Sequence, residues 1–179
     1  MDSAMQLGGF TREDYRAMPD DWRGELISGR LVMAPAPVPY HQHLLSQFLY
    51  RLMSHLGPDQ DWRVLLSPVD VEVDDHNIYQ PDVLILPPDS PRPHLEWEIP
   101  LPMWIVEVLS PSTAKYDKNV KLPKMAGAGV REAWLIAPRA RQIEVHDLAA
   151  DKKKIFEVGD TVASLTVPDF ELVLADYFV

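Results

Sequence analysis

Two acidic side chains stand in runs of apolar residues, where a charge is costly to bury. Asp82 opens the run at residues 82–86, and Glu107 interrupts the run at residues 103–109. An unpaired buried carboxylate costs several kcal/mol, so we expect Glu107 to face a cation or water, or to be protonated. The simpler alternative is a glutamate facing solvent at a strand edge. Two carboxylates that converge at adjacent strand ends form the oxygen site that Mg²⁺ prefers, and such an ion activates water and stabilises phosphoryl charge.

A lysine beside such an ion would orient the attacking water, and the lysines of this chain are confined to one segment. Residues 1–114 contain seven Arg, no Lys and 17 acidic residues, whereas residues 115–154 contain ten basic residues, among them all seven Lys, and five acidic residues. The lysine must therefore come from residues 115–154. A net charge of −10 argues against a nucleic-acid partner. The basic segment points the other way, although a solvated face is its simpler interpretation.

Four further side chains are informative. His41 falls on the apolar face of a predicted helix. It is either a core histidine whose hydrogen bonds are satisfied or a proton shuttle near the metal. Gln80 could position substrate or water. Trp104 and Trp134 lie in apolar runs and are expected in the core rather than in a base-stacking platform.

Hydrophobic periodicity predicts the elements that position these groups. A short helix is expected at residues 11–18 and a strand pair at 25–33, turning at Ser28 and Gly29. A long amphipathic helix spans residues 40–56 and closes at Gly57. Strand residues follow at 64–73, with Val69, Val71 and Val73 on one side.

Near-continuous apolarity predicts three strands at the centre of a sheet, at residues 82–86, 103–109 and 133–137. Residues 114–128 have the length of a crossover helix, and Pro123 should kink it or delay its start. Strands at 142–148, 154–158 and 171–174 complete a mixed α+β sheet with antiparallel edges. The proline-rich stretch at 87–102 is expected to be a surface loop.

Composition limits the class of protein. The 179 residues, 46% hydrophobic, suit one domain over residues 1–179. Without cysteine there is no disulfide framework and no zinc–thiolate site. The longest uncharged apolar stretch, residues 99–106, is far shorter than the roughly 20 residues of a membrane helix. Because a secretory signal pattern is also absent, we expect a cytoplasmic protein without a membrane partner.

The order of these residues resembles a known group of nucleases. Pro81 and Asp82, then 24 residues, then Glu107, Val108 and Leu109 resemble the PD-(D/E)xK pattern. The surrounding motifs are similar to those of the Uma2 family (DUF820), whose members are described as restriction endonucleases. These motifs are ELISGRL from Glu25, PAP from Pro35, HQ from His41, QPDV from Gln80, VEVLSPST from Val106, Asp117, KL from Lys121 and AGVREAWL from Ala128.

The resemblance covers roughly residues 10 to 178 and implies a restriction-endonuclease-like core, a mixed central sheet flanked by helices, with Mg²⁺ or Mn²⁺ at the active site. Asp82 and Glu107 match the metal-binding acids, with the backbone carbonyl of Val108 as a further ligand, and Glu25 matches an acid from the first helix-to-strand segment.

Leu109 departs from the pattern, because it replaces the lysine that ends the motif. In the family this lysine has moved to the following helix, where Lys121 is the matching position. Lys118 and Lys124 lie one helical turn away on either side and remain alternatives. Asp117 could hold Lys121 through an i, i+4 pair, or the two could form an ordinary surface pair.

The leading hypothesis is a Mg²⁺-dependent endonuclease that cleaves DNA, with Asp82, Glu107, Lys121 and Glu25 as catalytic residues. Two alternatives remain: a catalytically inactive nuclease-fold module that binds nucleic acid or protein, and a hydrolase of small phosphoesters. Enzymes that cut both strands often pair two active sites, so a symmetric homodimer is expected.

Overall fold

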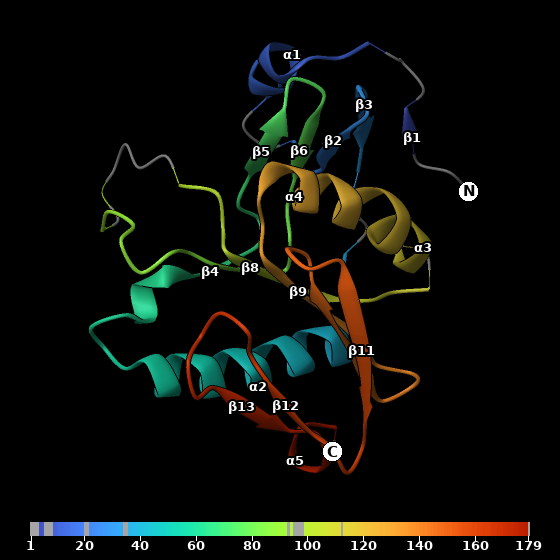
Figure 1. Ribbon diagram of the computed structural model, residues 1–179. Helices are drawn as coiled ribbons and strands as arrows, with labels where there is room; N and C mark the ends of the chain where they lie inside the picture. Colours follow the sequence, from blue (N-terminus) through green and yellow to red (C-terminus); the bar gives the residue numbers. More distant parts are fainter. Residues whose placement is uncertain are drawn as a thin grey trace.

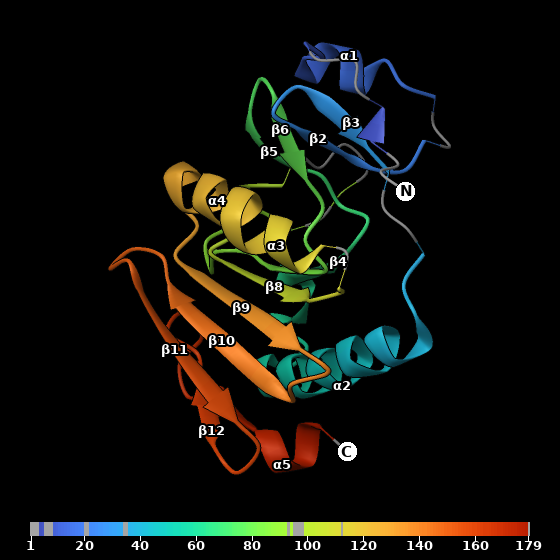
Figure 2. The same ribbon diagram turned by 90° about the vertical axis from the view of Figure 1, so that its right-hand side faces the viewer.

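The computed structural model describes residues 4–5, 9–19, 22–33, 36–92, 94, 99–111 and 113–178 (Figures 1 and 2). Pro35 of the PAP motif, the serine at position 112 and part of the predicted loop at 87–102 lie outside these residues. None of the helices within the described ranges is long and apolar enough to cross a membrane.

The centre of the molecule is a mixed sheet. Over the described residues, six strands run in the order β11-β10-β9-β8-β7-β4. β8 and β9 pair in parallel, and the other neighbours are antiparallel. The three apolar runs predicted for the centre therefore lie side by side there. The strands are β4 (Val64–Leu66), β7 (Val83–Ile85), β8 (Trp104–Val108), β9 (Glu132–Ala137), β10 (Gln142–Asp147) and β11 (Lys152–Glu157).

One face of this sheet is covered by the long helix α2 (Pro39–Leu56) and by the C-terminal elements (Figure 2). Phe48 of α2 packs edge-on against Trp104, with ring centroids 5.6 Å apart. Trp104 and Trp134 are fully buried, as predicted. The C-terminal elements are β12 (Thr161–Ala163), β13 (Glu171–Val173) and α5 (Leu174–Tyr177).

The opposite face carries the crossover helix that joins β8 to β9 (Figure 2). It comprises α3 (Ala114–Tyr116), the π-helical turn η2 (Asp117–Lys121) and α4 (Leu122–Ala128). Leu122 and Met125 of this helix pack against Ile105 and Leu135 of the sheet. The helix therefore lies directly above the strand that contains Glu107.

The N-terminal half forms a second sheet in the order β1-β3-β2-β6-β5. The predicted strand pair turning at Ser28 and Gly29 is present, and the predicted first helix begins after Thr11 with a capping box to Asp14. The elements are β1 (Ala4–Met5), α1 (Arg12–Arg16), β2 (Glu25–Ile27), β3 (Arg30–Val32), the 3₁₀ turn η1 (Asp61–Arg63), β5 (Val71–Asp74) and β6 (Asn77–Tyr79).

Two details of the predicted elements were wrong. Residues 64–73 are not one strand, because β4 belongs to the central sheet and β5 to the N-terminal sheet. Pro68 lies in the break between them and has no N–H to donate to a ladder. Pro123 does not interrupt the crossover helix either, since it stands in the first turn of α4 and the segment widens instead into the π turn just before it.

Candidate active site

The antiparallel register of β7 and β8 brings the two predicted metal-binding acids together. Val83 pairs with Val106, so Asp82 stands opposite Glu107 one residue further along. The Asp82 Oδ2 atom accepts a hydrogen bond of 2.7 Å from the Val108 backbone N–H, which fixes this carboxylate on the next strand. Glu107 shares a sheet face with Ile105, because side chains alternate along a strand. That face lies under the crossover helix.

Lys121 reaches these acids from the crossover helix. Its Nζ atom lies 2.6 Å from Glu107 Oε1 and 2.8 Å from Glu25 Oε1, and its side chain is only 4% exposed. Glu25 is the first residue of β2, and its Oε1 atom also accepts the Gln80 backbone N–H at 2.6 Å. The Lys121 ammonium thus bridges a carboxylate of the central sheet and a carboxylate of the N-terminal sheet.

Burial and the neighbouring charges shift the pKa values of these groups. Burial raises the pKa of Glu107 well above its ordinary value; Lys121 opposes this shift, while Asp82, Asp117 and Glu25 add to it. Burial disfavours the charged form of Lys121, but Glu107 and Glu25 outweigh burial and raise the Lys121 pKa. Lys121 therefore stays a cation, and the site carries more carboxylates than it can neutralise. The alternative of a solvent-facing glutamate is wrong for Glu107.

His41 stands beside Asp82 at the start of α2. Its Nε2 atom lies 3.2 Å from Asp82 Oδ2, and both side chains are largely buried. The Nδ1 atom is also buried and has no hydrogen-bond partner among the residues that the structure describes. His41 therefore faces the acidic site rather than the apolar core formed by the later turns of α2.

Lys118, Lys121 and Lys124 of the crossover helix bind three different parts of the molecule. Lys118 forms an ion pair with Glu144 of β10, and Lys124 lies 3.3 Å from Asp74 of β5. Residues three apart on a helix share a face, so these lysines follow one row. Of the three, Lys121 alone contacts Glu107, whereas Lys124 is turned toward the N-terminal sheet.

Gln80 and Asp117, two predicted accessory residues, differ in how their side chains lie. The Gln80 side chain points away from the acids and donates to Asp70 Oδ1 at 2.8 Å, so only its backbone N–H serves the site. Asp117 is buried, and burial raises its pKa while Lys121 lowers it. The alternative that Asp117 and Lys121 form an exposed surface pair is therefore wrong. Val108 donates its backbone N–H to Asp82, and the role of its carbonyl as a metal ligand stays a prediction.

Two glutamates were missed in the sequence. Glu144 is buried opposite Leu135, which in turn lies opposite Glu107. Glu132 is fully buried at the start of β9. Both are acids beside apolar strand residues, which is the same signal that singled out Glu107, and applying it to every strand would have found them.

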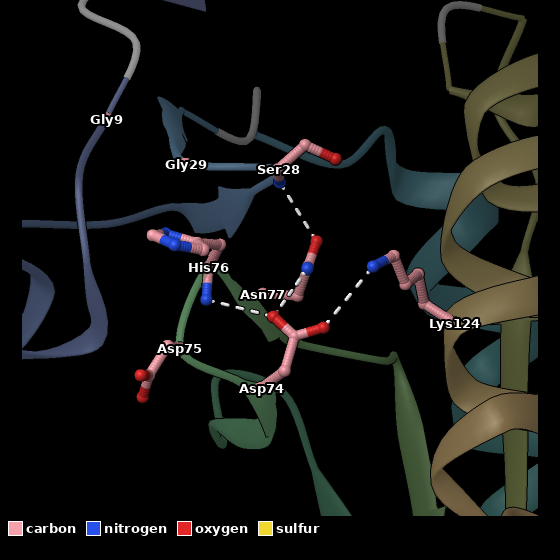
Figure 3. Close-up of a pocket in the computed structure, with 8 residues that line it drawn as sticks. All are labelled: Gly9, Ser28, Gly29, Asp74, Asp75, His76, Asn77 and Lys124. Carbon is pink, nitrogen blue, oxygen red and sulfur yellow. Dashed lines mark hydrogen bonds and ion pairs between the residues drawn. The ribbon is translucent and has the colours of Figure 1, made fainter.

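A hollow of about 720 Å³ lies beyond the end of the site, between the N-terminal sheet and α4 (Figure 3). Asp74 lines it and is bound there by Lys124, the His76 backbone N–H and the Asn77 side chain. These contacts hold the loop between β5 and β6 against the helix. Asp82 and Glu107 do not line this hollow.

The donor set of the acidic site fits a divalent cation. Asp82 and Glu107 offer hard carboxylate oxygens, and the surplus negative charge favours a cation there. Within the described ranges, no three His, Asp or Glu side chains are arranged to hold an ion by themselves. Mg²⁺ is commonly bound through one or two carboxylates, with water and substrate phosphate as the other ligands. Asp82 and Glu107 can supply that pair.

The fold has a solved counterpart. The crystal structure of "a putative nuclease belonging to DUF820 from Anabaena variabilis ATCC 29413" is 20% identical to this chain, with a TM-score of 0.81. The match covers 95% of this chain and 98% of that one, which shows that the α+β fold with its mixed sheet is the same.

The sequence also matches a family model, "Uma2: Putative restriction endonuclease", over residues 12–175. The chain therefore belongs to the Uma2 family, as its motifs indicated. No curated protein matches it.

Proposed function

We propose that this protein is a nuclease that hydrolyses DNA phosphodiester bonds with the help of Mg²⁺ or Mn²⁺. The observation that carries this proposal is the arrangement of Asp82, Glu107 and Lys121, three charged groups from separate elements that meet under the crossover helix. Membership of a family described as restriction endonucleases supports the nuclease class.

The acids would hold the ion. Asp82 and Glu107 would be its carboxylate ligands, with the Val108 carbonyl as a third donor. When bound, the ion lowers the pKa of a water molecule and stabilises charge on a phosphoryl oxygen. The hydrogen bond from the Val108 N–H to Asp82 keeps this carboxylate fixed.

Lys121 and His41 would handle protons and charge. The Lys121 ammonium can donate to the attacking water or to a phosphate oxygen, and Glu25 holds it in place from the opposite sheet. His41 lies within reach of Asp82, and an imidazole can both accept and donate a proton, so His41 is placed to pass a proton to or from this edge of the site.

Cleavage of supercoiled plasmid tests this proposal. We expect the wild type to nick or linearise plasmid with Mg²⁺ or Mn²⁺ and the Asp82→Ala variant to lose this activity. Lys124→Ala is the control, because Lys124 lies on the same helix as Lys121 and, among the described residues, forms its ion pair with Asp74 rather than with Asp82 or Glu107. Activity that survives Asp82→Ala would reveal another site or a contaminating enzyme.

One observation favours a second candidate, a nuclease-fold module without turnover. The Lys121 ammonium already contacts Glu107, so this buried charge has a partner without any metal ion. Titration calorimetry with Mn²⁺ separates the two candidates. Heat of binding that disappears in Asp82→Ala supports the enzyme, whereas a folded wild type that binds no Mn²⁺ supports the module.

We further propose a symmetric homodimer, because cleavage of both DNA strands is served by two paired active sites. Light scattering coupled to size-exclusion chromatography measures the mass directly. A mass of one chain at micromolar concentration, with or without DNA, would contradict the dimer.

A further inference from the structure

The long helix α2 contains no acidic side chain, although the chain is rich in acids. Of the 179 residues 27 are acidic, and none of these lies among the 18 residues of α2. The exposed positions of the helix carry Pro, Tyr, His, Gln, Ser and Met side chains instead. The solvent side of a helix ordinarily carries charged residues. This face therefore repels a polyanion less than a chain of net charge −10 does on average.

Three aromatic side chains stand along the exposed side of α2. Tyr40 and His43 lie about one turn apart, with their ring planes at 19° to each other and the ring centroids 6.1 Å apart. Tyr50 follows about two turns after His43 and is 72% exposed. Tyr40 and His43 are exposed as well. We call Tyr40, His43 and Tyr50 the α2 aromatic platform.

The platform begins beside the candidate active site. His41 follows Tyr40 in the chain, and its Nε2 atom lies 3.2 Å from Asp82. Burial raises the pKa of Tyr177, and Tyr40 and Asp82 both add to this shift, which indicates that the two groups lie near the same phenol. From there α2 runs along one face of the central sheet (Figure 2). Tyr50 is ten residues from Tyr40, or about 15 Å along the helix axis.

A row of exposed rings fits unpaired nucleobases. Proteins bind single strands by stacking successive bases on aromatic side chains, because every base has a π face. A duplex keeps its bases stacked inside the double helix and cannot offer them to such a row. The length of the platform corresponds to about four nucleotides at the roughly 3.4 Å spacing of a stacked strand. Stacking requires no positive charge, so it suits a chain of net charge −10.

We propose that the α2 aromatic platform binds an unpaired strand of DNA through its bases and leads this strand to Asp82 and Glu107. The inference rests on the proposed function, since it takes DNA as the substrate, and it adds that the strand next to the cleaved bond is unpaired. An aromatic pair three residues apart also stabilises a helix by itself. That role alone predicts a change in stability and no change in DNA binding.

The experiment is fluorescence anisotropy in EDTA, where binding is measured without cleavage, with a labelled single-stranded DNA of about 12 nucleotides. The same strand annealed to its complement is the duplex probe. The test variant is Tyr40→Ala/His43→Ala/Tyr50→Ala. The matched control, Tyr40→Phe/Tyr50→Phe, keeps all three rings and removes only the hydroxyl groups.

Both variants should fold, because the three positions are exposed and alanine favours a helix. Circular dichroism checks this. If the triple variant does not fold, Tyr50→Ala alone replaces it, since this position is the farthest of the three from the acids.

We expect the wild type to bind the single strand about tenfold or more tightly than the duplex. The triple alanine variant should bind the single strand about tenfold or more weakly than the wild type, and Tyr50→Ala about threefold or more weakly. The phenylalanine control should stay within about twofold of the wild type. The inference is overturned if the alanine variants bind the single strand as the wild type does, or if the wild type binds both probes equally.

The failure of this inference is distinguishable from the failure of the proposed function. A wild type that cleaves plasmid but binds no single strand would overturn this inference alone, whereas one that neither cleaves nor binds DNA would overturn both. Light scattering of the free protein tests a second copy of the chain as the occupant of this face. A mass of two chains for the wild type and of one chain for the triple alanine variant would assign the face to contacts between copies and overturn the inference.

Discussion

Glu107 and Glu132 are buried on neighbouring strands but face opposite sides of the central sheet. Glu132 lies on the α2 side, fully buried, and accepts five hydrogen bonds from neutral donors. These donors are the Trp134 indole, the Ser164 and Thr166 hydroxyls and the Leu165 and Thr166 backbone N–H groups. Glu107 lies on the opposite side, where the Lys121 ammonium is its partner and three further acids act on it.

The two environments indicate two different roles. Neutral donors fixed by the backbone satisfy the Glu132 carboxylate permanently, and the carboxylate in turn orders the loop at residues 164–166. Among the described residues, no neutral group donates a hydrogen bond to Glu107. Its partner is the Lys121 ammonium, and a metal cation can take the place of that ammonium at the carboxylate. A buried acid with fixed neutral partners is therefore structural, whereas one that is paired with a cation among further acids is suited to a functional site.

The largest expected effect is on stability at Glu132. Glu132→Ala leaves five donors without their acceptor, and we expect a loss of about 3–5 kcal/mol in the free energy of unfolding. Urea denaturation followed by circular dichroism measures this loss. A change below about 1 kcal/mol would show that water replaces the carboxylate easily and would weaken the contrast between the two glutamates.

Glu107→Gln should show the opposite behaviour. Lys121 keeps Glu25 as a partner, so the free energy of unfolding should change by less than about 1 kcal/mol. Plasmid cleavage should fall about 100-fold or more, the size of effect seen when a charge-stabilising group is removed from an active site. A variant that cleaves normally but has lost several kcal/mol of stability would reverse the proposed roles.

The pH dependence of stability sharpens the same comparison. Because the pKa of Glu107 is raised in the folded state, the folded protein holds a proton that the unfolded chain releases above about pH 4.5. Stability should therefore decrease as pH rises from this value through the folded-state pKa. In Glu107→Gln this decrease should become smaller, with Asp117 still contributing in the same direction. Parallel urea denaturation curves for the two proteins between pH 4 and pH 8 give the difference, and identical slopes would contradict the assignment.

The smallest effect is expected at the end of the lysine row. Lys124 and Asp74 are 45% and 43% exposed, so Lys124→Ala should cost at most about 1 kcal/mol of unfolding free energy. Cleavage should stay within about twofold of the wild type, since surface substitutions of this kind usually have small effects. Thermal denaturation and the plasmid assay check both values, and a loss of activity of about 100-fold would make Lys124 part of the site.

Much of this arrangement could be predicted from the sequence. The apolar runs around Val83 and Val106 predicted the central strands, and the pairing of Asp82 with Glu107 follows once those strands are neighbours. The family resemblance singled out Lys121, and the structure brings this lysine to the acids. These predictions succeeded because each depends on local periodicity or on a short ordered motif.

Other features depend on contacts that no local pattern contains. The direction of the Gln80 side chain is set by Asp70 and Tyr15. The π turn at residues 117–121 adjusts the helix so that Asp117 and Lys121 are both buried. Such features require the packed structure, because the energies involved arise between elements distant in the chain.

A crystal soaked in Mn²⁺ tests the central claim most directly, with anomalous scattering used to locate the ion. The account predicts a peak between the carboxylates of Asp82 and Glu107, with the Lys121 ammonium next to it, and no such peak in a Glu107→Gln crystal. A map with no peak at these carboxylates, or with manganese bound at another part of the molecule, would contradict it.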